Sequence, residues 1–371
     1  MKQLLYMKKL WAKYHFVIWA IVIWRSVLTI LEWVSTNVPV FSQTYIGRVP
    51  WSNTDGINYI RIAQWGYGSL NEAFFPLYPL LIRVLHSFVR LPLETIGIGI
   101  SMLCISAGLI VLYGMIAKTS VTKAKWCIGL ILSFPTAFFF TAVYTESLFF
   151  LLVVLILYFS AEKKWLLASI FVGLASATRI VGICTAMIVL YEMWKAKTRL
   201  TPLHTLGLLV MPVGLLSYMA FLFYTYGDPI RFVHIQAIYE INRTGGTFVL
   251  LPQVIWRYVK ILLSTYGTIH PLTYGVAIGE LALTLGAFWA LYYGWRKRMN
   301  VGYLLYGLVV LIIPTLTGTL MSMPRYILTI VPLYIALTYI RRDAVKYAIV
   351  SVFGLVQTVA VVFFLRGWFI A

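Results

Sequence analysis

The sequence predicts an all-α protein that crosses a membrane many times. Of its 371 residues, 61% are hydrophobic and 11% are charged, and the mean hydropathy is +0.88. These values are typical of polytopic membrane proteins and argue against a soluble globular domain. The formal net charge is +19, but the basic residues stand in short clusters between apolar runs. This is the positive-inside pattern, so we expect a lipid bilayer and not nucleic acid as the partner.

The first span is expected over residues 16–34, behind a lysine-rich start. The lysines indicate a cytoplasmic N-terminus, and the apolar run behind them is long enough to span, which disfavours a cleavable signal. Arg25 and Glu32 lie seven residues apart, near one helical face. An arginine inside a membrane needs a partner or a watery cavity.

A first outer loop is expected over residues 35–94, with its polar core at 51–80. Asp55 begins a short amphipathic helix that we expect to lie on the membrane surface and to end at Gly66. The aromatic and proline-rich run that follows fixes a stiff return to the apolar phase. Residues 73–92 carry three basic side chains, so we expect an interfacial helix there and not a span.

The middle of the chain predicts a span at 95–117 and then two tight hairpins, at 126–160 and 165–194. Lysines flank the bases of both hairpins, so their tips point outward and carry Glu146 and Arg179. Each leg of the second hairpin has about fifteen residues, or ~22 Å, less than the ~30 Å hydrocarbon core. We therefore expect the tips to dip into a recess.

The second half predicts a second outer loop, 225–265, that ends in an amphipathic helix. Its other segments are a span at 202–224, spans at 270–293 and 301–320, a descending segment that ends before Arg341, and a last span at 347–365. The count is about eleven spans, with the C-terminus outside, in one membrane domain over 1–371.

The outward segments collect charged side chains on one side of the membrane. These are Asp55, Glu146, Asp228, Arg179, Arg231, His234 and Arg325. An enzyme that moves a sugar from a lipid phosphate to a hydroxyl needs such groups. A carboxylate must take the proton of the attacking hydroxyl, and arginines stabilise the leaving phosphate through bidentate contacts.

Each of these residues also has a simpler explanation. Asp55 could cap its helix, Glu146 could be a loop carboxylate, and Arg179 could reach to the surface. Asp228 precedes a proline and fits a turn, and Arg325 fits a turn beside an interfacial tyrosine. The common side of the membrane is a stronger argument than any single residue.

Six sequence blocks, in this order, resemble the family of the second mannosyltransferase of GPI-anchor synthesis (phosphatidylinositol glycan class V) and its bacterial relatives. The blocks are Asp55-Gly56 with Tyr59 and Gly66-Tyr67; Ala73-Phe74-Phe75-Pro76-Leu77-Tyr78-Pro79; Tyr144-Thr145-Glu146-Ser147-Leu148-Phe149; Thr178-Arg179 with Gly182; Gly227-Asp228-Pro229 with His234 and Gln236; and Pro324-Arg325-Tyr326 with Pro332. The resemblance covers the chain from about residue 50 to about residue 335.

The resemblance implies a GT-C fold and an inverting glycosyltransferase that acts outside the cytoplasm. Its donor would be a polyprenyl-phosphate-linked hexose such as mannose. It implies Asp55 as the general base, Glu146 as a second acid that orients sugar or acceptor, and Arg179 and Arg325 as holders of the donor phosphate. The family usually has tryptophan directly before this aspartate, and this chain has Thr54.

Further substrate-binding residues are expected in the same blocks: Tyr59, Arg61, Phe75, Tyr78, Asp228, His234, Gln236 and Tyr326. The acceptor is an envelope glycolipid, glycan or protein. No cofactor is certain, and a divalent cation requires the carboxylates to lie within a few ångströms of one another. The alternative functions are a lipid-linked sugar transporter, which Arg25 and Glu280 within spans would serve, and a noncatalytic lipid-binding subunit. The sequence does not indicate an oligomeric state.

Overall fold

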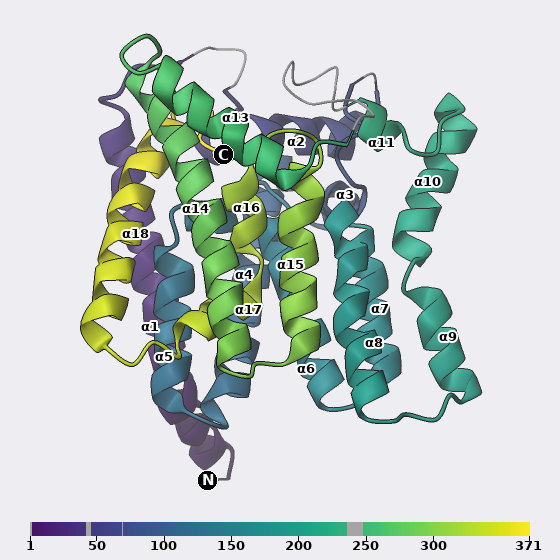
Figure 1. The fold of residues 1–371 in the computed structure, drawn as a ribbon. Helices are drawn as coiled ribbons and strands as arrows, with labels where there is room; N and C mark the ends of the chain where they lie inside the picture. The colour runs from purple at the N-terminus through teal and green to yellow at the C-terminus, as the bar shows by residue number, and fades with distance from the viewer. Residues whose placement is uncertain (1, 42–45, 69, 236–247) are drawn as a thin grey trace.

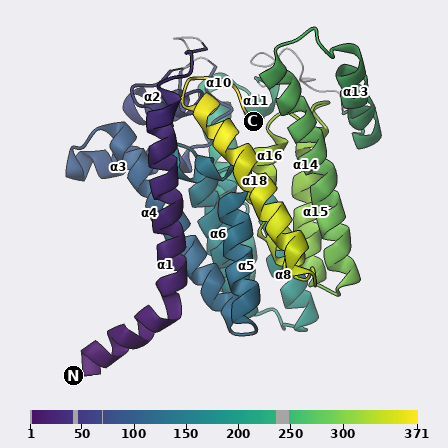
Figure 2. The same cartoon turned by 90° about the vertical axis from the view of Figure 1, so that its left-hand side faces the viewer.

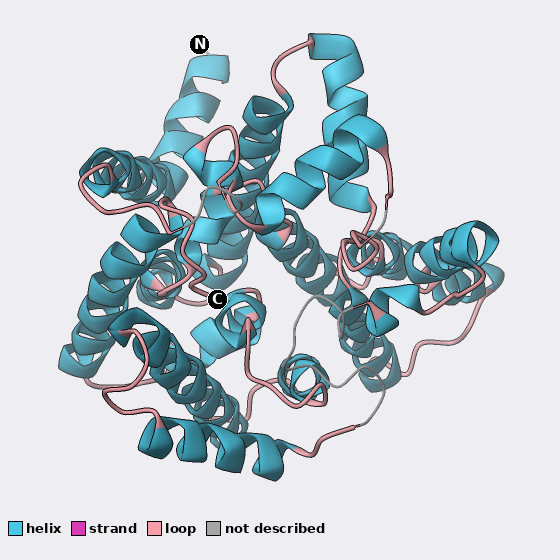
Figure 3. Cartoon of the chain, turned by 90° about the horizontal axis from the view of Figure 1, so that it is seen from above, coloured by secondary structure: helices cyan, strands magenta, loops and turns pink. Residues whose placement is uncertain are grey.

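The computed structural model describes residues 2–41, 46–68, 70–235 and 248–371. Within these ranges every regular element is helical, and Figure 3 shows only helices and the loops that join them. The elements of the first half are α1 (Lys2–Ser35), η2 (Pro50–Ser52), α2 (Asp55–Trp65), α3 (Leu77–Val89), α4 (Leu93–Ala117), α5 (Val121–Ser133), η3 (Ala137–Thr141), α6 (Glu146–Ala161), α7 (Trp165–Ser176), η4 (Ile180–Thr185) and α8 (Ala186–Lys195). Those of the second half are α9 (Pro202–Val210), α10 (Val213–Tyr226), α11 (Arg231–His234), α13 (Leu251–Ser264), α14 (Pro271–Arg296), α15 (Val301–Thr315), α16 (Met323–Leu328), α17 (Val331–Leu337) and α18 (Asp343–Phe364). The predicted all-α class is confirmed.

Four described helices are long and apolar enough to cross a membrane. They are the Trp11–Ser35 part of α1, α4, α14 and α18, and the pair α9 and α10, bent by 45° at a short break, makes a fifth if it counts as one span. The protein is therefore a helical membrane protein, as its composition predicts. Other apolar helices are shorter: α6 has 16 residues, α15 has 15 and α7 has 12. The remaining spans of the predicted eleven stay a prediction.

The two predicted hairpins are formed by α5 with α6 and by α7 with α8. Their outer ends are not simple turns, because each contains a 3₁₀ segment, η3 or η4. Helix α6 packs against both α4 and α7, which places it inside the bundle. Phe138, Phe139 and Phe140 of the first tip are at most 1% exposed. The tip of the first hairpin is therefore buried within the protein, and a recess below the membrane surface stays a prediction.

The helices run between two distinct ends of the molecule. Figure 1 shows the N-terminus at one end and the C-terminus near the other, and Figure 2 shows α1 and α18 along the same flank. The turns after α8, α14 and α17, which carry basic residues, lie at the N-terminal end. The short helices α2, α11 and α13 lie at the opposite end. The two ends thus differ in charge and in structure.

Helix α2 forms where the sequence predicts it, but only part of its predicted face is buried. Ile57, Ile60, Ala63 and Tyr67 recur at helical spacing, which predicts burial on that side; Ala63 is buried, and the other three are only half-buried. The buried residues are Gly56, Tyr59, Ile62 and Ala63. The reason is tertiary: α2 packs on α3 and α4 and against the ring of Tyr144, and these neighbours cover the side that carries Tyr59. Gly66 ends the helix at φ +89°, as expected.

The span predicted over 301–320 ends five residues early, and the descending segment behind it consists of two short helices. Helix α15 ends at Thr315, and residues 316–322 form an irregular loop before the short helices α16 and α17. Gly318 and Ser322 have positive φ angles, +87° and +64°. This loop brings Arg325, the third residue of α16, into the interior.

Candidate functional site

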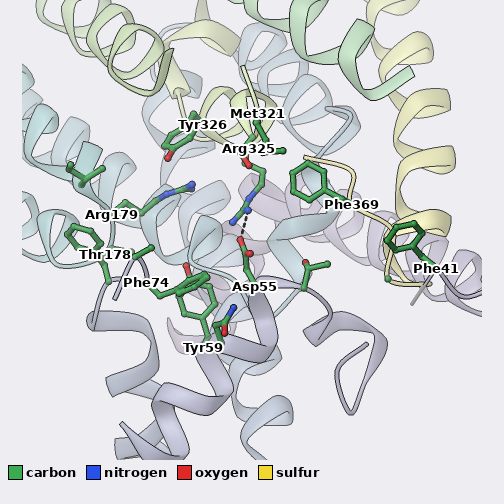
Figure 4. Close-up of a pocket in the computed structure, with 17 residues that line it drawn as sticks. Phe41, Asp55, Tyr59, Phe74, Thr178, Arg179, Met321, Arg325, Tyr326 and Phe369 are labelled. Carbon is green, nitrogen blue, oxygen red and sulfur yellow. Dashed lines mark hydrogen bonds and ion pairs between the residues drawn. The ribbon is translucent and has the colours of Figure 1, made fainter. Parts of the chain in front are cut away.

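A cavity of about 470 Å³ opens at the end of the bundle that holds α2 and α16. Figure 4 shows acidic, basic and aromatic side chains around it, from segments far apart in the chain. Its lining residues are Phe41, Thr54, Asp55, Asn58, Tyr59, Ala73, Phe74, Phe75, Thr178, Arg179, Ile180, Met321, Ser322, Arg325, Tyr326, Gly367 and Phe369. Five of the six resembling sequence blocks meet at this cavity or directly behind it.

Arg325 is the centre of the polar network. Its Nη1 donates to Oδ2 of Asp55 at 2.6 Å, and its Nε donates to Oε1 of Glu146 at 2.7 Å. The guanidinium carbon also lies 4.8 Å from the centroid of the Tyr144 ring and 5.1 Å from that of Phe139. Two charge-assisted hydrogen bonds and two aromatic faces therefore fix one guanidinium group, which is 9% exposed.

Glu146 lies behind the cavity and joins the two arginines. Its side chain is fully buried, and Oε1 also lies 3.3 Å from Nη1 of Arg179. The Arg179 guanidinium stacks 4.8 Å from the ring centroid of Tyr326, at the cavity wall. Together with Asp55, these residues make two negative and two positive groups, so their formal charges sum to zero. Glu146 is not among the lining residues, and its contacts are those of a group that orients arginines.

Asp55 is presented to the cavity by an unusual start of α2. It is the first residue of that helix, and its side chain is 34% exposed. The Tyr144 hydroxyl donates to the Asn53 carbonyl at 3.0 Å, accepts from the Asp55 N–H at 3.2 Å and bonds the Thr54 hydroxyl. These bonds hold Thr54 at φ +54°, a region that a threonine rarely adopts. No side-chain capping bond is present at this helix start, and the Asp55 carboxylate instead points at Arg325.

Only part of the expected site residues meet at the cavity. Those that line the cavity are Asp55, Tyr59, Phe75, Arg179, Arg325 and Tyr326. Two others of the first loop do not line it: Tyr78 is buried and donates to the Gly97 carbonyl at 2.9 Å, and Arg61 is exposed. Gln236 lies outside the described residues.

Burial, with the Glu146 and Asp55 carboxylates nearby, raises the pKa of the Tyr59 hydroxyl far above its usual value, so this group stays protonated.

Asp228 and His234 form a separate cluster, away from the lining of the cavity. His234 Nδ1 lies 2.8 Å from Asp228 Oδ2, and Arg231 donates to the fully buried Glu72 at 2.8 Å. Burial raises the pKa of Asp228, but the hydrogen bonds from His234 and the Ile230 N–H, together with the charges of His234 and Arg231, outweigh it and lower that pKa. This cluster contacts the wall of the cavity, since the centroid of the Phe75 ring, which lines the cavity, lies 5.3 Å from that of the Phe232 ring.

Sequence reasoning missed several residues of the cavity. Asn58 stands one turn after Asp55, and the helical period alone could have placed it on the same side. Met321 and Ser322 directly precede the Pro324 block. Phe369 comes from the C-terminal tail, which is tied to the first outer loop because Arg366 Nε donates to the Val38 carbonyl at 2.7 Å. No local signal in the sequence predicts that tie.

The described residues offer no group of three or more His, Cys, Asp and Glu side chains placed to hold a metal ion. Asp55 and Glu146 are bridged by the Arg325 guanidinium, and Asp228 belongs to the other cluster. The three carboxylates that could have shared a cation are therefore apart. The positive charge beside Asp55 comes from arginine.

A second cavity, of about 560 Å³ and mostly apolar, lies on the other side of the 74–79 segment. Leu77 and Ala177 line it, and the Leu77 N–H donates to the Ala177 carbonyl at 3.0 Å. Phe75, two residues before Leu77, and Thr178, directly after Ala177, line the first cavity. The two cavities therefore adjoin through one hydrogen-bonded pair of segments.

No family model, no curated protein and no solved structure matches the chain. The family resemblance carried by the sequence blocks stays a prediction.

Proposed function

We propose that the protein is a membrane glycosyltransferase of the GT-C type that transfers a sugar, most simply mannose, from a polyprenyl-phosphate donor to a hydroxyl of an envelope glycolipid, glycan or protein. The observation that carries this proposal is that one cavity is lined by a carboxylate, Asp55, and two arginines, of which Arg325 pairs with Asp55 and Arg179 lies beside Glu146. A base and a phosphate-binding pair are the two functions that this reaction requires.

In the proposed reaction, the acceptor oxygen attacks the anomeric carbon of the sugar while the bond from that carbon to the phosphate oxygen breaks. The acceptor proton passes to the Asp55 carboxylate, and the bonding electron pair leaves on the phosphate oxygen. The attack comes from the face opposite the leaving group, so the configuration is inverted. The products are the glycosylated acceptor and polyprenyl phosphate.

The arginines have the chemistry to receive the leaving phosphate. Arg179 and Arg325 both border the cavity, and Glu146 holds them from behind. Since their geometry is fixed by buried contacts, little reorganisation is needed when charge develops on the phosphate. Tyr59, held in its protonated form, supplies a hydroxyl to the cavity beside Asp55.

The adjoining apolar cavity supports a lipid-linked donor. Its lining includes Leu77, Leu80, Tyr218 and Phe221, and two glycines and two prolines add little polarity. A polyprenyl chain that leaves the bilayer there would bring its phosphate to the 74–79 segment, next to Arg179. Apolar area would then contribute binding that does not depend on the sugar.

The membrane arrangement that we propose has eleven crossings, with the N-terminus in the cytoplasm and the cavity outside. Three observations support it. The basic turns after α8, α14 and α17 gather at one end, the cavity lies at the other, and the two termini lie at opposite ends. An odd number of crossings requires the two termini to lie at opposite ends of the molecule.

The proposal is tested with the purified full chain in lipid nanodiscs. Polyprenyl-phosphate mannose and a panel of other polyprenyl-phosphate hexoses serve as donors, and a membrane lipid and glycan extract supplies acceptors. We expect sugar transfer from one donor of the panel, with inverted anomeric configuration in the product. Failure of every donor while polyprenyl phosphate still binds would contradict catalysis and favour a transporter or a lipid-binding subunit. A parallel assay with chelator determines whether a metal ion takes part.

A further inference from the structure

Glu280 is a buried carboxylate in the middle of α14, outside the cavity lining. Glu280 is 4% exposed, and most other residues of the helix are apolar. Its Oε2 accepts from the Tyr258 hydroxyl at 2.6 Å, and its Oε1 accepts from the Ser322 N–H at 3.2 Å. The carboxylate therefore joins the helix α13 to the loop 316–322.

Tyr258 and its neighbour Arg257 add further bonds between α13 and this loop. The Tyr258 hydroxyl accepts from the Leu320 N–H at 3.2 Å and lies 3.2 Å from Oγ1 of Thr319. Arg257 Nη1 donates to the Gly318 carbonyl at 2.7 Å. Figure 1 shows α13 lying across this end of the molecule, over α14 and α16. The loop is therefore bonded to α13 and to Glu280 of α14.

The loop that is held in this way shapes the cavity. Met321 and Ser322 of the loop line the cavity. The Ser322 carbonyl also accepts a hydrogen bond from the Arg325 N–H, at 3.0 Å, in the first turn of α16. Ser322 also has a positive φ, which costs energy in a serine and needs support from its surroundings. The hydrogen bond from the Ser322 N–H to Glu280 supplies this support. Ser322 stands three residues before Arg325, so the bond acts about one helical turn from that arginine.

We propose that Tyr258 and Glu280 are positioning residues that hold the loop 316–322 and thereby place the Arg325 guanidinium between Asp55 and Glu146. The consequence for catalysis rests on the proposed function. A simple packing role does not account for this pair, because a carboxylate inside an apolar helix is costly and leucine would join two helices without it. The carboxylate has one use that leucine lacks, which is to accept the two hydrogen bonds.

The first test measures hydrogen exchange of the full chain in detergent micelles, for Tyr258→Phe and Glu280→Gln. The matched control is Tyr266→Phe, because Tyr266 lies just beyond the same helix and is 79% exposed. We expect the amides of Leu320 and Ser322 to exchange about tenfold faster in the two variants, the equivalent of one lost hydrogen bond. Exchange in α6 and in the control should not change.

The second test separates kcat from the donor KM for the same variants. We expect kcat to fall about 10- to 100-fold, as for a displaced catalytic group, because Arg325 acts on charge that develops in the transition state. The donor KM should change less than kcat. Should Tyr258→Phe fail to fold, Arg257→Leu removes the donor to the Gly318 carbonyl and leaves the buried pair of Tyr258 and Glu280 in place.

Unchanged exchange at Leu320 and Ser322 would overturn the proposal, and so would faster exchange with an unaltered kcat. If the wild-type chain transfers no sugar, the proposed function fails by itself. The exchange measurement then decides alone whether Tyr258 and Glu280 hold the loop, since it needs no substrate.

Discussion

At the scale of single residues, Glu146 shows why the arginines of the cavity stay in place. It is a fully buried carboxylate with one oxygen near both Arg179 and Arg325. Two guanidinium groups beside one another would repel without it. The two hydrogen bonds of Arg325, and the position of each arginine over an aromatic ring, counter part of the cost of burying these charges.

Replacing Glu146 by glutamine should destabilise the protein by roughly 3 to 5 kcal/mol, because it leaves uncompensated positive charge in the interior. The measurement is thermal or denaturant unfolding in detergent. Glu162→Gln is the matched control, since Glu162 forms an exposed pair with Lys118 at the opposite end of α6, and it should leave stability unchanged. Equal stability of the two variants would show that the buried network contributes nothing.

The sequence predicts part of this residue-scale picture. Asp55, Glu146, Arg179 and Arg325 all fall in segments placed on one side of the membrane, and the structure brings these four together. Asp228 and His234 fall on that side too, but they pair with each other elsewhere. Counting spans predicts on which side of the membrane a residue lies, but not how far apart two residues lie in the plane of the membrane. It therefore cannot distinguish the four residues at the cavity from Asp228 and His234.

At the scale of elements, the second hairpin depends on a very close approach of backbone. A Cβ atom on Gly182 would lie 2.0 Å from the Ala175 carbonyl oxygen. This contact presses η4 onto the end of α7, and Arg179 stands directly between the two. Glycine is needed here for space, and the packing it allows fixes the direction in which Arg179 leaves the hairpin.

Gly182→Ala should therefore destabilise the protein by about 1 to 3 kcal/mol, as overpacked cores do, and lower sugar transfer along with stability. Gly279→Ala is the control, because a Cβ there meets nothing within 4 Å in the middle of α14. Unfolding temperatures of both variants in detergent provide the comparison. A Gly182 variant as stable as the control would contradict the packing argument.

Helix existence is well predicted from the sequence, and helix continuity is not. Apolar length predicts α4, α14 and α18, and Asp55 with Gly66 predicts α2. The sequence extends the span before Pro324 to residue 320, but α15 ends at Thr315 and the irregular loop 316–322 follows. Hydropathy alone does not reveal a loop whose shape is fixed by distant helices. Tyr258 and Glu280 supply that hold from α13 and α14.

At the scale of the whole molecule, the two ends of the bundle are expected to face different compartments. Cysteine labelling tests this in a chain whose native cysteines are replaced by alanine. Lys163→Cys, in the turn after α6, should react only after the membrane is permeabilised. Thr268→Cys, in the exposed turn between α13 and α14, should react in intact cells. Labelling of both positions from one side would contradict the proposed arrangement.

The central claim is that Asp55 is the base of a glycosyl transfer, and its most direct test is the transfer rate of Asp55→Asn in nanodiscs. Asparagine keeps the shape and can still accept from Arg325, but it cannot take the acceptor proton. Asp343→Asn is the matched control, because Asp343 is also the first residue of a helix but lies at the other end of the molecule. We predict a loss of about a hundredfold to ten-thousandfold for Asp55→Asn, with binding of polyprenyl phosphate retained and the control unchanged. Transfer by Asp55→Asn at the wild-type rate would contradict the claim.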